Sequence, residues 1–189
     1  MKKQTSTMQL AVTGVMAALV FFGSMFSIPI PLPVGPATRI HLGNIFCLLS
    51  GFVLGPVFGG LSAGIGSFFF DLLNPQYIAD SPFTFCFKFL MGFLCGKIAR
   101  LGGRNAENMK LDFLAAAGGQ LTYIVLYAGK GFVENLLMRM ELVPALGILA
   151  TKVAASLTNG IIAVILSVPL YFVIRRALQS NQLFHKMNL

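Results

Sequence analysis

The sequence carries very little charge for its length. Of its 189 residues only 11% are Asp, Glu, Lys or Arg, whereas 56% are hydrophobic. A soluble domain contains roughly 25% charged residues. This deficit excludes a soluble enzyme, a disordered chain and a coiled coil, and it predicts an integral membrane protein.

The sequence also lacks the residues that most catalytic and cofactor sites need. It has no Gly-x-x-x-x-Gly-Lys-Ser/Thr phosphate loop, and its two histidines, His41 and His185, are too few for a zinc or haem cage. A Gly-x-Ser-x-Gly string surrounds Ser62, but it lies in an apolar run without a histidine, so it is interpreted as a small-residue packing face. We therefore expect no enzymatic activity, no metal and no cofactor.

The three cysteines are too scattered to form a disulfide framework or a metal site. Cys47, Cys86 and Cys95 all lie inside apolar stretches. Cysteine in such a setting behaves as a small hydrophobic residue. We expect all three to be buried.

Apolar runs long enough to enter a membrane recur along the chain. A helix needs roughly 20 apolar residues to cross the hydrocarbon core. The predicted spans are residues 8–28, 42–54, 57–72, 83–99, 111–127 and 146–174. Prolines at alternate positions in 28–33 predict an extended segment, and Gly55-Pro56 predicts a tight hairpin. The expected fold is all-α, a compact bundle of six transmembrane helices forming a single domain over 1–189, with an extended first outer loop.

The cations indicate how the bundle is oriented. The chain has 14 Lys and Arg against six Asp and Glu, a net charge of +8. One side of the predicted membrane holds nine cations: Lys2, Lys3, Lys97, Arg100, Arg104, Lys110, Arg175, Arg176 and Lys186. The other side holds Arg39, Lys130 and Arg139. The positive-inside rule then places both termini in the cytoplasm, and the positive charge does not indicate nucleic-acid binding.

Two outer segments are too long to be simple connections, and a third has an amphipathic pattern. Residues 29–41 are proline-rich, and residues 73–84 contain Asn, Gln, Tyr and Asp. Residues 129–144 alternate apolar and charged side chains at helical spacing, which predicts a short amphipathic helix on the outer surface. Because loops often carry function in scaffolded proteins, we expect the functional site at this end.

Three ionisable residues lie inside the predicted spans. Asp71, Lys88 and Lys152 are all in the outer half, where such groups are costly and mark functional sites. An internal pair between Asp71 and one lysine is an equally good interpretation, and it leaves the other lysine unpaired. With nearby asparagines and tyrosines, they predict a polar cavity with aromatic walls that opens outward and holds a small polar ligand.

The stretch 43–60 resembles a known family. It contains Gly51-Phe52-Val53-Leu54-Gly55-Pro56-Val57-Phe58-Gly59-Gly60, which is similar to a Gly-Phe-x-Leu-Gly-Pro-x-x-Gly-Gly hairpin in substrate-binding S components of energy-coupling factor (ECF) vitamin transporters. The six predicted helices, the extended first loop and the small-residue first helix fit the same family.

The resemblance implies a mechanism and partners. An S component binds its vitamin from outside in the plasma membrane of a bacterium, surrounded by lipid. It then docks on a transmembrane coupling subunit powered by two cytoplasmic ATPases and topples to release the vitamin. Docking uses small residues of the first helix, which here correspond to Ala11, Gly14, Ala17 and Ala18. No nucleic-acid partner is expected.

The residues and the resemblance together give a candidate binding site. The predicted substrate-binding residues are Arg39, Asn44, Asp71, Lys88, Tyr123, Tyr127 and Lys152. Arg39 and Lys88 would attract an anionic group, the tyrosines would enclose an apolar part, and Asp71 would orient a lysine. The extended 29–36 segment would act as a lid. Riboflavin, pantothenate, pyridoxine-like and folate-like vitamins all remain open as ligands.

Two other functions also fit the sequence. A small ion-coupled secondary transporter would work alone and use Asp71 as its proton or sodium site. A structural or biosynthetic membrane subunit would bind no small molecule. A co-purified vitamin would distinguish the S component from both.

Overall fold

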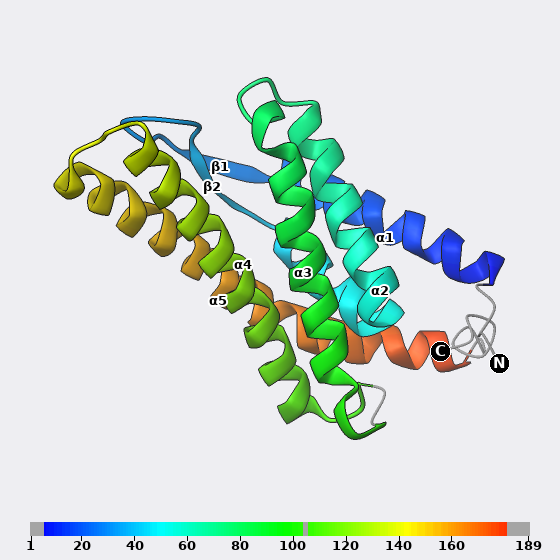
Figure 1. The fold of residues 1–189 in the computed structure, drawn as a ribbon. Helices are drawn as coiled ribbons and strands as arrows, with labels where there is room; N and C mark the ends of the chain where they lie inside the picture. The colour runs from blue at the N-terminus through cyan, green and yellow to red at the C-terminus, as the bar shows by residue number, and fades with distance from the viewer. Residues whose placement is uncertain (1–5, 104–105, 181–189) are drawn as a thin grey trace.

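The computed structural model describes residues 6–103 and 106–180. This part of the chain forms α1 (Thr7–Met25), α2 (Gly43–Leu72), α3 (Ser81–Ala99), α4 (Met109–Leu137) and α5 (Leu142–Ser180). Strands β1 (Ser27–Ile30) and β2 (Thr38–His41) precede α2, and the short 3-10 helices η1 (Ile78–Asp80) and η2 (Leu101–Gly103) flank α3. Figure 1 shows α4 and α5 as an antiparallel pair beside the group of α1, α2 and α3.

The five helices are long and apolar enough to cross a membrane, which agrees with the membrane protein predicted from composition. The predicted spans 42–54 and 57–72 both fall within α2, on either side of Gly55, whose backbone is not helical. Four of the cations used to predict orientation, Lys2, Lys3, Arg104 and Lys186, lie outside the described residues, as does His185.

Helix α2 reverses its direction at the predicted Gly55-Pro56 break. Gly55 has φ 80° and ψ −171°, a conformation that is essentially restricted to glycine. The Ser50 hydroxyl donates to the Gly59 carbonyl at 2.9 Å, although these residues would be about 13 Å apart along a straight helix. Residues 43–54 and 56–72 are therefore two antiparallel arms, called the first and second arm below.

Arg100 holds the end of the first arm. Its guanidinium donates to the carbonyl oxygens of Gly51 at 3.0 Å and Phe52 at 2.9 Å. These carbonyls belong to the last turn of the arm, where Gly55 and Pro56 leave them without the next helical N–H donors. A cation at a helix C-terminus also interacts favourably with the helix dipole.

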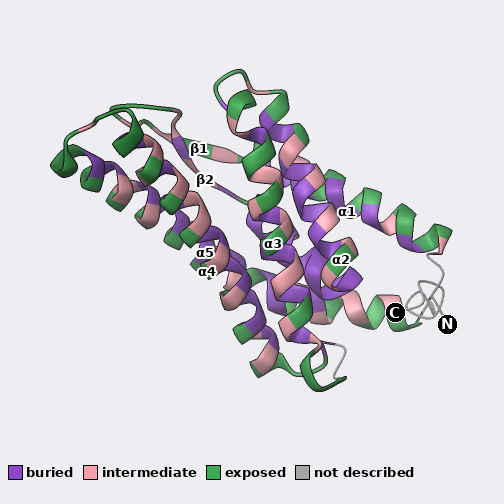
Figure 2. Cartoon of the chain, viewed as in Figure 1, coloured by how far each residue is buried: buried purple, intermediate pink, exposed green. Residues whose placement is uncertain are grey.

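Glycines let α2 and α3 approach until their backbones touch. A Cβ on Gly51 would lie 2.6 Å from the Gly92 carbonyl oxygen, and one on Gly96 would lie 2.7 Å from the Gly55 carbonyl carbon. The small-residue rows are therefore packing faces, as predicted. Ser62 belongs to the same packing, because its hydroxyl donates to the Thr13 carbonyl of α1 at 3.0 Å. Figure 2 shows that α2 is buried over most of its length.

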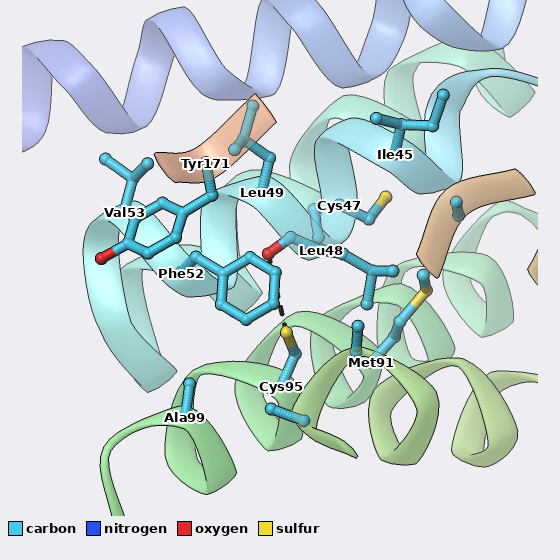
Figure 3. Packing of buried hydrophobic residues seen from close by; sticks show 14 of the residues in the cluster. Ile45, Cys47, Leu48, Leu49, Phe52, Val53, Met91, Cys95, Ala99 and Tyr171 are labelled. Atoms are coloured by element: carbon cyan, nitrogen blue, oxygen red, sulfur yellow. Dashed lines mark hydrogen bonds between the residues drawn. The ribbon is translucent and has the colours of Figure 1, made fainter. Parts of the chain in front are cut away.

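The core is centred on the first arm. Figure 3 shows Phe52 against Tyr171 of α5, with ring centroids 5.2 Å apart, and the Cys95 thiol directed at the Leu48 carbonyl. Cys47 and Cys95 are buried, as expected. Cys86 is exposed, so the expectation of three buried cysteines is wrong for this residue. It lies on the α3 face that turns away from the bundle, where an apolar residue needs no protein neighbour in a membrane.

The predicted extended segment pairs with the strand that follows it. β1 and β2 are antiparallel, with Pro29 opposite Arg39 and Ile28 opposite Ile40. The first loop is thus a β-hairpin, a strand pairing that the all-α prediction did not include.

The amphipathic surface helix predicted at 129–144 is absent as a separate element. The polar side chains did not end α4, which continues to Leu137, and α5 begins at Leu142. The turn between them has Arg139 in a left-handed conformation, with φ 60°. The predicted limits of these two helices were therefore too short.

Substitution of Gly55 tests the reversal of α2. We expect Gly55→Ala to lower the free energy of unfolding by about 1–3 kcal/mol, because alanine is strained at this φ and ψ. Thermal unfolding of the purified protein in detergent measures the effect. Gly129→Ala is the matched control, since nothing lies within 4 Å of a Cβ built there. Equal stability of the two variants would contradict the proposed constraint.

Candidate functional site

A pocket lies where β2 meets the halves of α2, α3, α4 and α5 that are nearest to the β-hairpin. Six of the seven predicted site residues line it: Arg39, Asp71, Lys88, Tyr123, Tyr127 and Lys152. Asn44 is the exception, because it lies behind Lys88 and not on the pocket surface. The structure thus brings together residues that are up to 113 positions apart in the sequence (152 − 39).

Arg39 is held on several sides. Its Nη2 donates to the Asp71 carboxylate at 2.7 Å. The guanidinium carbon lies 4.1 Å from the centre of the Phe70 ring and 4.2 Å from that of the Tyr77 ring. The other terminal nitrogen, Nη1, is buried and has no hydrogen-bond partner. A buried donor without a partner is costly, so this nitrogen is available to a ligand acceptor.

The ion-pair partner of Asp71 differs from the partner predicted from the sequence. The candidate partner was Lys88 or Lys152, but the carboxylate binds Arg39. The guanidinium presents a planar set of donors that suits a carboxylate, and β2 carries it directly to the end of the second arm. Asp71 therefore orients an arginine, and the interpretation as an Asp–Lys pair is wrong.

Asn159 of α5 fixes β2 in place. Its side-chain oxygen accepts from the His41 backbone N–H at 2.8 Å, and its amide donates to the Arg39 carbonyl at 2.8 Å. These bonds satisfy the strand edge that β1 does not cover. The sequence shows that Asn159 is a polar amide in the middle of an apolar run. It does not show which strand this amide binds.

Lys88 lies deep in the pocket and is almost completely buried. Its ammonium donates to the Asn44 side chain and lies 3.7 Å from the centre of the Tyr123 ring. Asn44 in turn donates to Gln120 at 3.2 Å, and Gln120 donates to the Ser156 carbonyl at 3.3 Å. This chain of amides joins α2, α3, α4 and α5 below the pocket. Gln120 was not among the predicted residues.

Tyr123 and Tyr127 form a flat aromatic wall. They are one helical turn apart on α4, and their rings stack with centroids 5.6 Å apart and an interplanar angle of 9°. The Tyr127 hydroxyl contacts the Thr38 hydroxyl of β2 at 3.2 Å. The wall is therefore fixed relative to the strand that carries Arg39.

A second ion pair joins α4 to η1. Lys130 of α4 contacts the Asp80 carboxylate at 2.5 Å and that of Glu134 at 2.6 Å. Asp80 belongs to η1, in the segment that connects α2 to α3. The Lys130–Asp80 pair thus connects α4 to this segment across the pocket.

Two titratable groups of the connecting segments are neutral. Burial, together with the positive charges of Lys88 and Arg39, lowers the pKa of His41 well below its usual value. The neutral imidazole accepts the Gly43 backbone N–H at its Nδ1. Burial raises the pKa of Tyr77, so its phenol also stays neutral.

The pocket is narrow in this conformation. The volume open to water inside it is about 50 Å³, which is enough for a few water molecules. A ligand larger than a few water molecules therefore requires side chains or connecting segments to move apart. The two ion pairs, Arg39–Asp71 and Lys130–Asp80, are the contacts that such a movement would strain.

The predicted docking residues do not all share one face of α1. Ala11, Gly14 and Ala18 are exposed, and nothing lies within 4 Å of a Cβ built on Gly14. Ala17 is buried, and its carbonyl lies 2.2 Å from a Cβ built on Gly66. Ala17 therefore packs on α2, and its assignment to the docking face was wrong because it points about 100° away from Ala18 on the helix.

The anchoring of β2 by Asn159 can be tested directly. We expect Asn159→Leu to lower the free energy of unfolding by about 1–3 kcal/mol, because it removes both hydrogen bonds to the strand while keeping the side-chain volume. Thermal unfolding in detergent measures this. Thr158→Val is the control, since Thr158 is exposed and bonds only within its own helix. An unfolding temperature of Asn159→Leu equal to that of Thr158→Val would show that Asn159 does not hold β2 in place.

This chain is similar to known proteins in sequence and in fold. Residues 4–176 match the family described as "ECF-type riboflavin transporter, S component". A solved S component of a bacterial ECF transporter superposes with a TM-score of 0.61 at 19% identity, covering 90% of this chain and 96% of the other. The S component for biotin from an ECF-type ABC transporter gives a TM-score of 0.61 at 19% identity, covering 86% and 89%. No curated protein matches the sequence.

Proposed function

Because the chain belongs to the family of S components of ECF-type riboflavin transporters, we propose that the pocket between β2 and helices α2 to α5 binds riboflavin. The chain is a substrate-binding subunit for vitamin uptake, and such subunits work with a transmembrane coupling subunit and ATPases. Which vitamin it binds and which residues bind it are the parts that we propose.

The observation that carries the proposal is the unpartnered Nη1 of Arg39 beside an aromatic wall. Riboflavin has a planar ring system with several acceptor atoms along one edge, and a polyhydroxylated chain. Nη1 can donate to such an acceptor, while the rings of Tyr123, Tyr127 and Tyr77 offer apolar faces. The amphipathic pocket suits a flat amphipathic ligand.

The two arms of α2 support an orientation of the bundle in the membrane. Counting each arm as one crossing gives six crossings, which returns the end of α5 to the side on which α1 begins. The described cations at this side are Lys97, Arg100, Lys110, Arg175 and Arg176. We place this side in the cytoplasm of a bacterium and the pocket toward the outside.

The partners would be a coupling subunit and two ATPases, which supply the energy that this chain cannot obtain from a nucleotide. The exposed small residues Ala11, Gly14 and Ala18 form a flat strip on α1 that suits close approach of another helix. We assign docking to this strip.

Arg39→Lys tests the assignment of the free guanidinium nitrogen. Lysine keeps a positive charge near Asp71 but loses the planar set of donors. We expect riboflavin affinity to fall by about tenfold or more, the value of a charge-assisted hydrogen bond. Titration of the purified protein by flavin fluorescence measures it, with Arg176→Lys at the opposite end as the control. Equal riboflavin affinity in the two variants would show that Arg39 does not bind riboflavin.

The secondary-transporter alternative makes the opposite prediction about partners. An S component reconstituted alone in liposomes binds riboflavin with one-to-one stoichiometry but does not accumulate it. Accumulation driven by a proton or sodium gradient without ATPases would contradict the proposal. The engagement of Asp71 with Arg39 at 2.7 Å argues against a free ion site there.

Gly14→Leu separates docking from binding. A leucine here projects into open space and disturbs no packing within this chain. We expect riboflavin binding to stay intact and uptake by the complete transporter to fall at least about tenfold, because a bulky side chain blocks close helix contact. Gly129→Leu, also in open space but on α4, is the control. Normal uptake with Gly14→Leu would place docking elsewhere.

A further inference from the structure

Gln120 of α4 is a buried amide that lies behind the pocket. It borders a groove between α4 and α5 whose other lining residues are apolar. The groove belongs to the membrane-crossing part of these helices, where an amide without hydrogen bonds is costly. Gln120 is only 3% exposed and therefore depends on partners within the protein. The direction of its hydrogen bonds shows what the amide does.

The hydrogen bonds from the pocket to Gln120 and on to α5 all run in one direction. The Lys88 ammonium donates to the Asn44 side-chain oxygen. The Asn44 nitrogen donates to the Gln120 oxygen at 3.2 Å, and the Gln120 nitrogen donates to the Ser156 carbonyl at 3.3 Å. An ammonium can only donate and a carbonyl can only accept. The two ends of the series therefore fix the orientation of both amides between them.

An inverted Gln120 amide would break the series. Its oxygen would face the Ser156 carbonyl and its nitrogen would face the Asn44 nitrogen, so neither contact could be a hydrogen bond. If Asn44 also turned over, its nitrogen would face the Lys88 ammonium, and two donors would oppose each other. The Ser156 carbonyl thus determines, through two amides, that an oxygen faces Lys88.

Gly160 allows Gln120 to reach this carbonyl. Ser156 and Gly160 are one turn apart on α5, and a helical carbonyl points toward the residue four positions later. A Cβ on Gly160 would lie 2.6 Å from the Gln120 Cγ and 3.2 Å from its amide nitrogen. Because Cγ is close to the base of the side chain, it cannot move away without displacing the amide. A larger residue at 160 would therefore separate Gln120 from α5.

Lys88 is held by the same face of α4 in two ways. Its ammonium lies 3.7 Å from the centre of the Tyr123 ring, and Tyr123 follows Gln120 by three residues, on the same side of the helix. The ring contacts the ammonium directly, whereas Gln120 acts on it through Asn44. An ammonium has three donors, so the ring and the Asn44 oxygen leave one for a ligand in the pocket that Lys88 lines.

We propose that Gln120 is a positioning residue, which fixes the orientation of the Asn44 amide and thereby the place of the Lys88 ammonium in the pocket. Gln120 acts from behind, since Asn44 and Lys88 lie between it and the pocket. The inference rests on the proposed function, because riboflavin affinity reports where the ammonium lies.

The test is a double-mutant cycle on the purified full-length protein, with riboflavin affinity measured by flavin fluorescence. Gln120→Met keeps an unbranched side chain of similar length but cannot hold the Asn44 amide. We expect it to lower the affinity by about fivefold or more, the value of a lost hydrogen bond. In the Asn44→Leu background the same change should alter the affinity by less than about twofold, because the link to Lys88 is already absent.

A purely structural role of Gln120 gives a different result. If Gln120 only stabilises the packing of α4 on α5, Gln120→Met lowers the affinity by the same factor with and without Asn44. Thr122→Val is the control on α4, since the Thr122 hydroxyl donates to the Gly118 carbonyl of its own helix. Its riboflavin affinity should equal that of the wild type.

Gly160→Ala gives an independent measurement, because it displaces Gln120 without changing its chemistry. It should also weaken riboflavin binding, whereas Gly147→Ala, in open space on the same helix, should not. If the wild-type protein does not bind riboflavin, the proposed function fails together with this role of Gln120. If it binds, but Gln120→Met and Gly160→Ala leave the affinity unchanged or the cycle is additive, the proposed function stands and the positioning role is wrong.

Discussion

The reversal of α2 at Gly55 is the constraint on which the pocket depends. At 1.5 Å per residue the first arm, residues 43–54, rises about 18 Å, and the second arm, residues 56–72, rises about 25 Å. The first arm is therefore shorter than the second, and β2 occupies the remaining depth beside it. Its His41 reaches Asn159, which lies 17 residues, about 26 Å, along α5 from Leu142 (159 − 142). A longer first arm would fill the space in which Arg39 now lies.

Electrostatics then determines how the elements around this space are joined. Charged side chains in a membrane protein are stable only with partners, and here the partners come from different elements. Arg39–Asp71 joins β2 to α2, and Lys130–Asp80 joins α4 to η1. Lys88 is solvated by an amide and an aromatic ring in place of an acid. Among these described groups, Arg39 Nη1 is buried and has no hydrogen-bond partner.

The sequence predicted what depends on composition and local pattern. The apolar runs, the Gly55-Pro56 break and the extended Pro29–Pro31 segment are local, and all three are present. Six of the seven predicted site residues line one pocket because costly polar residues in apolar helices collect where they can be solvated. The partner of Asp71 and the role of Asn159 depend on how deep β2 enters the bundle, which no local pattern records. The length of α4 was also missed, because charged residues do not end a helix that extends beyond the apolar layer.

The contacts of α1 with α2 connect the strip that we propose for docking (Ala11, Gly14 and Ala18) to the pocket. Gly66 leaves room for the Ala17 carbonyl, and Ser62 donates to Thr13, so the buried face of α1 lies directly against the second arm. These backbone approaches leave no space for α1 to slide or rotate without displacing the arm. The same arm ends at Phe70 and Asp71, which hold Arg39. A partner that tilts α1 must therefore move the α2 wall of the pocket with it, whereas α4 and α5 are connected to that wall at this end through ion pairs and hydrogen bonds that can break. The pocket thus lies between two groups of helices. Close backbone packing joins α1 to α2, whereas ion pairs and hydrogen bonds join α4 and α5 to α2 at this end.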